Sequence, residues 1–102
     1  MSNNFEEAIR EKEEVDFKKP SLYNVIFLND DVTTFDFVVL VLQKYFSRSL
    51  DDAIDLSFKI DDEGFAIVGT YTKEVAEMKV LEVINFARSE GFPLMLIMEK
   101  NE

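Results

Sequence analysis

Short, dense apolar runs alternate with longer periodic segments along the chain after Pro20. The dense runs are rich in β-branched and aromatic side chains, which favour strands. They predict three strands, at residues 23–28, 65–70 and 94–98. The longer segments have helical spacing and predict three helices, at about residues 34–46, 49–60 and 72–90.

Each predicted helix begins at a residue that can cap it. The caps are Thr33 or Thr34 for the first helix, Ser49 for the second and Thr72 for the third. The first helix is rich in valine, which favours strand, but its length and its cap favour a mostly buried helix. Asn29–Asp31 and Asp61–Gly64 are predicted as turns because Asn and Asp bond their own backbone, and Gly91 is predicted to end the third helix.

The resulting order β-α-α-β-α-β predicts an α+β fold, with a three-stranded antiparallel sheet packed against three helices. Residues 1–19 differ from the rest, because ten of them are charged and few are apolar. Such a segment buries too little surface to fold by itself. We therefore expect a flexible charged arm at residues 1–19 and one domain at residues 20–102.

Composition narrows the function classes. The 102 residues include no Cys and no His, so an ordinary zinc site and the Ser-His-Asp and Cys-His nucleophiles are excluded. The net charge of −10 disfavours binding to nucleic acid or to anionic membranes. No disulfide is possible, so a cytoplasmic location is the natural expectation. These features disfavour an enzyme and favour a binding module that needs no cofactor.

The acidic clusters leave three alternatives open. Asp30, Asp31 and Asp36 could bind Ca²⁺ or Mg²⁺, which would permit a small metal-dependent enzyme. Turn formation and helix capping explain the same residues more simply. A third use is recognition of a free peptide N-terminus, because Asn29 can accept from an ammonium group and donate to the following carbonyl. A nearby Asp would supply the opposite charge.

An ordered series of motifs decides among these alternatives. The series comprises Lys-Pro-Ser-Leu-Tyr-Asn-Val at 19–25, Leu-Asn-Asp-Asp-Val-Thr at 28–33, Val-Leu-Gln-Lys-Tyr-Phe-Ser at 41–47, Thr-Lys-Glu-Val-Ala-Glu at 72–77 and Pro-Leu at 93–94. Together these motifs strongly resemble the ClpS family over about residues 19–100. ClpS is the bacterial adaptor that delivers N-degron substrates to the ClpA–ClpP protease.

The resemblance implies a site for each part of the substrate. Asn29, Asp30 and Asp31 would bind the α-ammonium and the first peptide group. The pocket for an N-terminal Leu, Phe, Tyr or Trp side chain would be lined by Phe27, Leu28, Thr33, Phe35, Val38, Ser57, Ile60 and Leu94. Glu74 and Lys79, on the polar side of the third helix, would dock on the N-terminal domain of ClpA. Residues 1–19 match the extension that the family feeds toward the unfoldase, and the high charge favours a monomer.

Three positions depart from the family pattern. Asp61 stands where the family usually has a His that bonds the α-ammonium, while Phe35 and Ser57 replace two pocket methionines. We expect Asp61 to keep binding the amine, with a stronger dependence on salt and a loss at low pH, where carboxylates protonate. The missing His leaves one alternative: a ClpS-like docking module that modulates the unfoldase without recognising an N-terminal amine.

Overall fold

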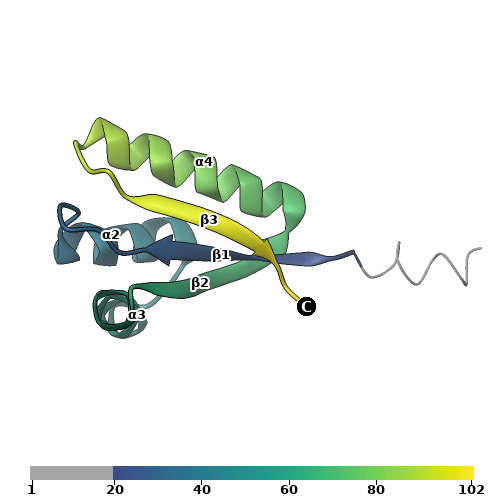
Figure 1. Cartoon of the computed structure of the whole chain (residues 1–102), viewed down its shortest axis with the longest axis horizontal. Helices are drawn as coiled ribbons and strands as arrows, with labels where there is room; N and C mark the ends of the chain where they lie inside the picture. The colour runs from purple at the N-terminus through teal and green to yellow at the C-terminus, as the bar shows by residue number, and fades with distance from the viewer. Residues whose placement is uncertain (1–19) are drawn as a thin grey trace, which may run out of the picture.

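The computed structural model describes residues 20–102, and the arm expected at residues 1–19 lies outside the described residues. The elements are β1 (Leu22–Leu28), α2 (Phe35–Phe46), α3 (Leu50–Glu63), β2 (Phe65–Thr72), α4 (Lys73–Ser89) and β3 (Met95–Lys100). Their order confirms the prediction (Figure 1).

The sheet is antiparallel and has the order β2-β1-β3. Strand β1 therefore lies in the centre, where Phe27 pairs with Ala66 on one side and with Leu96 on the other. A bulge between Val25 and Ile26 shifts the register with β2. The α+β class predicted from the element order is confirmed.

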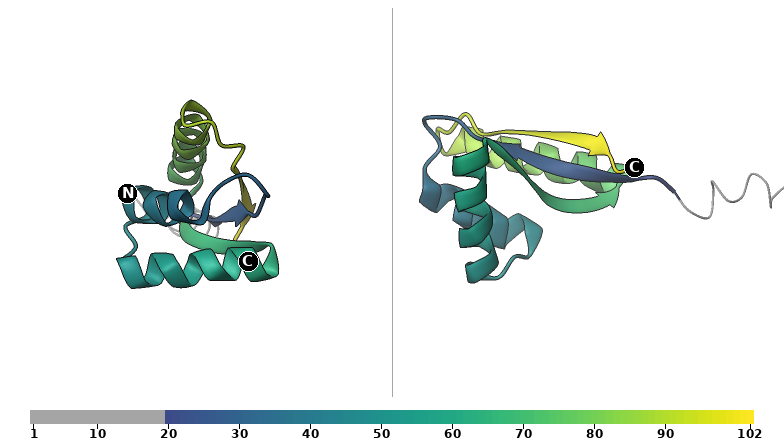
Figure 2. Two further views of the ribbon diagram at one scale, coloured as in Figure 1. Left: turned by 90° about the vertical axis from the view of Figure 1, so that its left-hand side faces the viewer. Right: turned by 60° about the horizontal axis from the view of Figure 1, so that its bottom comes forward.

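The helices form one layer against the sheet (Figure 2). Helix α4 contacts all three strands, whereas α2 and α3 pack mainly on each other and reach the sheet at β2. The largest fully buried side chains come from both layers: Phe27, Leu42, Leu94, Val25, Val41, Val68 and Val83. Each contributes about 1.5–3 kcal/mol by its removal from water.

Side chains fix where two of the helices begin. The hydroxyl of Thr34 accepts from the Phe37 N–H at 3.2 Å, and the hydroxyl of Ser49 accepts from the Asp52 N–H at 3.1 Å. Thr34, not Thr33, is thus the cap of α2. Thr72 occupies the cap position of α4, but its side chain makes no capping hydrogen bond.

The turn predicted at Asp61–Gly64 is wrong for three of its four residues. Helix α3 continues through Glu63, and only Gly64 leaves it, with a left-handed φ of 91°. The Gly64 N–H still donates to the Ile60 carbonyl at 2.8 Å, which completes the last turn.

The second and third strands end two residues later than predicted, at Thr72 and Lys100. They do so because β1 pairs along its whole length, up to Leu22 with Thr72.

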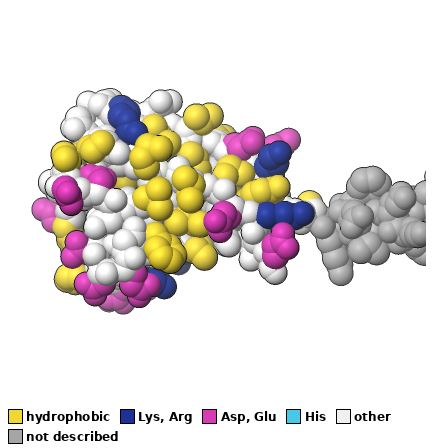
Figure 3. Space-filling model, viewed as in Figure 1, with side chains coloured by type: hydrophobic (Ala, Val, Ile, Leu, Met, Phe, Trp, Pro, Cys, Tyr) yellow, Lys and Arg dark blue, Asp and Glu magenta, His cyan; other side chains and the backbone are white. Residues whose placement is uncertain are grey.

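The sheet face opposite the helices is open and apolar. Phe65, Ile67, Met95 and Ile97 are each at least 40% exposed there, and they flank Ile26 and Leu28 of the central strand. Figure 3 shows hydrophobic side chains gathered over the strands in this view. None of the helices in residues 20–102 combines the length and the apolar character needed to cross a bilayer.

Candidate functional site

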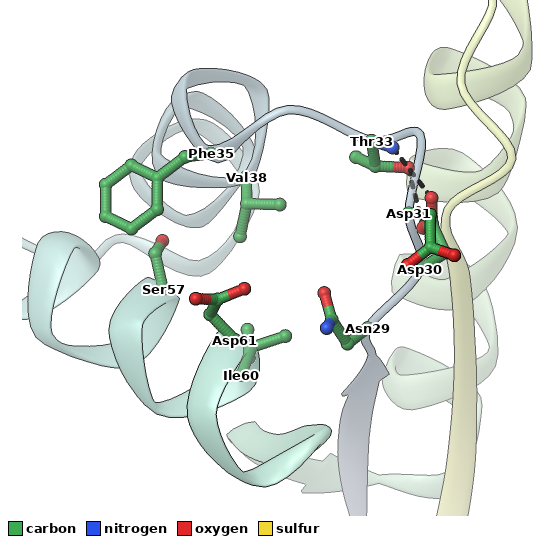
Figure 4. Close-up of a pocket in the computed structure, with 9 residues that line it drawn as sticks. All are labelled: Asn29, Asp30, Asp31, Thr33, Phe35, Val38, Ser57, Ile60 and Asp61. Carbon is green, nitrogen blue, oxygen red and sulfur yellow. Dashed lines mark hydrogen bonds between the residues drawn. The ribbon is translucent and has the colours of Figure 1, made fainter.

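A pocket of about 270 Å³ opens where β1 ends. Its walls come from the loop after β1, the first turn of α2 and the second half of α3 (Figure 4). The lining residues are Asn29, Asp30, Asp31, Thr33, Phe35, Val38, Ser57, Ile60 and Asp61. All four residues predicted to bind the amine therefore line the same cavity as five of the residues predicted to form its wall.

One backbone hydrogen bond brings the two halves of the rim together. The Asn29 N–H donates to the Gly64 carbonyl at 2.9 Å, which fastens the end of β1 to the end of α3. Asp61 lies one turn earlier in α3, so its carboxylate and the Asn29 amide both point into the space between the helix and the loop (Figure 4). Both residues are exposed, so their polar groups are accessible from solvent.

Asp30 stabilises the loop that carries the rim. Its Oδ1 accepts from the N–H groups of Val32 and Thr33 at 2.9 and 2.7 Å, and its Oδ2 accepts from the Thr33 hydroxyl at 2.7 Å. Burial alone would raise the pKa of Asp30, but these hydrogen bonds and the charge of Arg88 outweigh it and hold the pKa below its ordinary value. Asp30 is therefore ionised, and most of its hydrogen-bonding capacity is used inside the loop.

The inner wall of the pocket is apolar. Val38 and Ile60 are buried, and Phe35 closes one side with 38% of its surface exposed. Ser57 is also buried, and its hydroxyl donates to the Ala53 carbonyl at 2.8 Å within its own helix. Since that proton is already used, the Ser57 hydroxyl can offer a ligand only the lone pairs of its oxygen.

Three residues expected in the pocket wall do not line it. Phe27 is fully buried and packs edge-on against Phe46, with ring centroids 5.6 Å apart. Leu94 is likewise buried in the core, and Leu28 pairs with Phe65 and Met95 in the sheet. Alternation along β1 turns the Phe27 side chain toward the helix layer. The placement of these three residues in the pocket wall stays a prediction.

The two residues expected to dock the unfoldase differ in their surroundings. Glu74 is exposed in the first turn of α4. Lys79 is half-buried, and its ammonium donates to the Tyr45 carbonyl at 2.7 Å. It also lies 5.8 and 5.6 Å from the ring centroids of Phe46 and Tyr71. Lys79 therefore ties α4 to the end of α2.

Sequence reasoning missed Phe58. Its ring packs on Phe35, with centroids 4.8 Å apart and an interplanar angle of 54°, so it supports the outer side of the pocket wall. The spacing of Leu50, Ile54 and Phe58, each four residues from the next, could have identified this stripe. Within residues 20–102 there is no group of three or more Asp and Glu side chains placed to hold a metal ion.

Comparisons with known proteins agree with the geometry. The family model described as "ATP-dependent Clp protease adaptor protein ClpS" matches residues 18–97. The ATP-dependent Clp protease adapter protein ClpS of Vibrio atlanticus is 41% identical over 105 residues, covering 98% of this chain and 99% of its own length. The ClpS of Burkholderia mallei is 40% identical over 93 residues, covering 91% of this chain and 89% of its own.

A solved structure is also similar. Agrobacterium tumefaciens ClpS2 bound to L-phenylalaninamide superimposes with a TM-score of 0.78 at 35% identity, covering 81% of this chain and all of that one. The family match spans most of the described residues, and the relatives match nearly their whole length. This chain therefore belongs to the ClpS family of adaptor proteins of the ATP-dependent Clp protease.

Proposed function

We propose that this adaptor binds proteins with an N-terminal Leu, Phe, Tyr or Trp and delivers them to the unfoldase ClpA for degradation by ClpP. One observation carries the proposal: oxygen acceptors and an apolar wall belong to the same 270 Å³ pocket. A similar protein holds L-phenylalaninamide, which has a free amine and an aromatic side chain, and this supports the same ligand chemistry here.

The rim matches the polar part of such a ligand. An N-terminal ammonium has three donors, and the carboxylates of Asp31 and Asp61 with the Asn29 amide oxygen supply acceptors. The Asn29 NH₂ group can donate in turn to the first carbonyl oxygen. Asp30 adds negative charge beside the amine without giving up its loop contacts. In this proposal Asp61 performs the amine contact that the family usually assigns to His.

The apolar wall of the pocket suits a large apolar side chain on the first residue of the ligand. Burying a large apolar side chain is worth about 1.5–3 kcal/mol, and each charge-assisted hydrogen bond adds about the same. After the entropy cost of binding, the sum corresponds to roughly micromolar affinity. Small or β-branched side chains would leave unfilled space beside Val38 and Ile60, so they should bind less well.

Docking on the unfoldase is proposed at the opposite end of β1. The pocket follows Leu28, whereas α4 begins after Thr72, which pairs with Leu22. Seven residues of strand separate the two sites by roughly 20 Å, so both can be occupied at once. Glu74 shares a surface cavity with Pro20 and Tyr23, so a docked partner would lie beside Pro20, the residue that follows the proposed arm of residues 1–19.

A peptide series tests amine recognition by the monomer. A Phe-initiated peptide should bind, whereas its N-acetylated form and Met- or Val-initiated forms should bind at least tenfold more weakly, as measured by fluorescence anisotropy. Equal binding of the acetylated peptide would contradict the proposal. If no peptide bound while the ClpA N-terminal domain still did, the chain would be a docking module without N-terminal recognition.

A further inference from the structure

A second apolar groove lies between α2 and α3, next to the pocket. It has a volume of about 340 Å³, and its lining residues are Phe35, Asp36, Val39, Leu40, Gln43, Leu50 and Ile54, of which only Asp36 is charged. Two of these residues are strongly exposed for their type: Leu40 at 46% and Leu50 at 53%. Phe58, at 56%, stands at the end nearer the pocket. Exposed apolar side chains that cluster in this way are typical of binding surfaces.

Because of their helical spacing, the apolar side chains of the groove form continuous stripes along α2 and α3. Leu50, Ile54 and Phe58 follow one another at intervals of four along α3, and Asp61 of the pocket rim follows Phe58 by three. On α2, Phe35 and Val39 have the same spacing. The groove therefore runs along the helix pair and ends at the pocket.

Phe35 belongs to both cavities. It lines the pocket on one side and the groove on the other, and its ring packs on Phe58 at 4.8 Å between centroids. A ligand whose first side chain fills the pocket has only this aromatic pair to cross before it meets Ile54 and Leu50. The two cavities are thus parts of one surface.

We propose that the groove binds apolar side chains of the substrate that follow its N-terminal residue, which makes it a specificity subsite of the adaptor. This inference rests on the proposed function. From Asp61 to Leu50 the helix spans eleven residues, or roughly 16 Å at about 1.5 Å per residue. An extended chain covers that length with about five residues at roughly 3.3 Å each. The subsite would therefore read positions 2 to 6 of the substrate.

Charge favours a substrate over a second copy of this chain as the occupant. The net charge is −10, and Asp36, Asp51 and Asp55 lie on the helices that form the groove. Two copies that met at this surface would bring these carboxylates together at a cost in repulsion. An unfolded substrate segment with apolar and neutral or basic residues meets no such cost.

The test compares three ligands of increasing length. They are L-phenylalaninamide, a Phe-initiated peptide with Ser and Gly at positions 2 to 6, and the same peptide with Leu at positions 3 and 5. We expect the Leu-containing peptide to bind about tenfold more tightly than the Ser/Gly peptide, because two side chains leave water. The double variant Leu40→Asn/Leu50→Asn should remove this preference and leave binding of L-phenylalaninamide unchanged.

A matched control uses Leu81→Asn, since Leu81 is 61% exposed on α4, away from the groove. That variant should keep the full preference. Equal affinity of the parent for both peptides, or a preference that survives in the double variant, would overturn the inference while leaving the proposed function intact. Failure of the parent to bind L-phenylalaninamide would overturn both. Concentration-dependent dimerisation that the double variant abolishes would show that a second copy fills the groove instead.

Discussion

The backbone N–H of Asn29 donates to the carbonyl oxygen of Gly64 at 2.9 Å, although 35 positions separate the two residues in the chain. This bond joins the end of the central strand to the end of α3. It places the Asn29 amide opposite Asp61, so that the two face one cavity (Figure 4). The shape of the rim thus depends on how α3 ends.

Substitution of Gly64 should lower the stability of the fold. Gly64 has a φ of 91°, where a Cβ is unfavourable, although nothing lies within 4 Å of that position to clash with it. We expect Gly64→Ala to lower the free energy of unfolding by about 1–2 kcal/mol through backbone strain alone. Urea denaturation measures this. Gly64→Asn is the matched control and should lose less, because Asn tolerates the left-handed region better. Equal losses in the two variants would contradict the explanation by strain.

Removal of the Asp61 charge should weaken amine binding. The loss of one charge-assisted hydrogen bond predicts that Asp61→Asn binds a Phe-initiated peptide about 10- to 100-fold more weakly, with a smaller dependence on salt. Fluorescence anisotropy at low and high salt measures both effects. Asp62→Asn is the control, because it removes the same charge one residue away, outside the pocket lining. If the two variants bound alike, Asp61 would act only through long-range charge.

The sequence predicts the order of elements well because the local signals agree. Thr34 and Ser49 cap the helices they precede, and Gly91 adopts the left-handed φ of 85° expected after α4. The end of α3 is predicted wrongly, because Asp61 and Asp62 favour turns locally. A hydrogen bond from Gly64 back to Ile60 and the pairing of β1 with β2 outweigh that preference.

The sequence predicts which residues belong to the site, but it does not predict how their side chains pack. The resemblance assigns Asn29 and Asp61 to one site, and both line the same cavity. It also assigns Phe27 to the wall, but the Phe27 side chain is fully buried in the core. The bond from Lys79 to Tyr45 spans 34 positions, and helical periodicity alone cannot reveal such a contact. Long-range packing decides which predicted side chains remain free.

Asp30 should make stability depend on pH in the acidic range. Its pKa in the folded protein is below the ordinary value of 3.8, so the ionised form stabilises the fold above that pH. This contribution is lost as the pH falls through the folded pKa. We expect Asp30→Asn to be less stable than the parent by about 1 kcal/mol near neutral pH, with a gap that narrows below 3.8. Urea denaturation of both proteins from about pH 7 to pH 2.5 measures the gap. A gap that stayed constant would contradict the role given to the ionised carboxylate.

Variants of Glu74 and Lys79 should affect different properties of the protein: Glu74 its binding to the unfoldase, and Lys79 its stability. Lys79→Met leaves the part-buried Tyr45 carbonyl without its donor, so we expect the free energy of unfolding to fall by about 1–2 kcal/mol. Glu74→Ala removes an exposed side chain and should change stability by less than about 0.5 kcal/mol. If Glu74 contacts the unfoldase, the same variant should weaken binding to the ClpA N-terminal domain, as measured by calorimetry.

Lys73→Met is the stability control for Lys79→Met, since it removes an exposed lysine from the same helix. It should unfold like the parent. If Lys79→Met unfolded like the parent, the bond from Lys79 to Tyr45 would contribute little to stability. Lys79 would then be free to contact the ClpA domain. Unchanged binding of Glu74→Ala to the ClpA domain would instead move the proposed docking surface away from the start of α4. The two measurements together distinguish a residue that shapes the surface from one that contacts the partner.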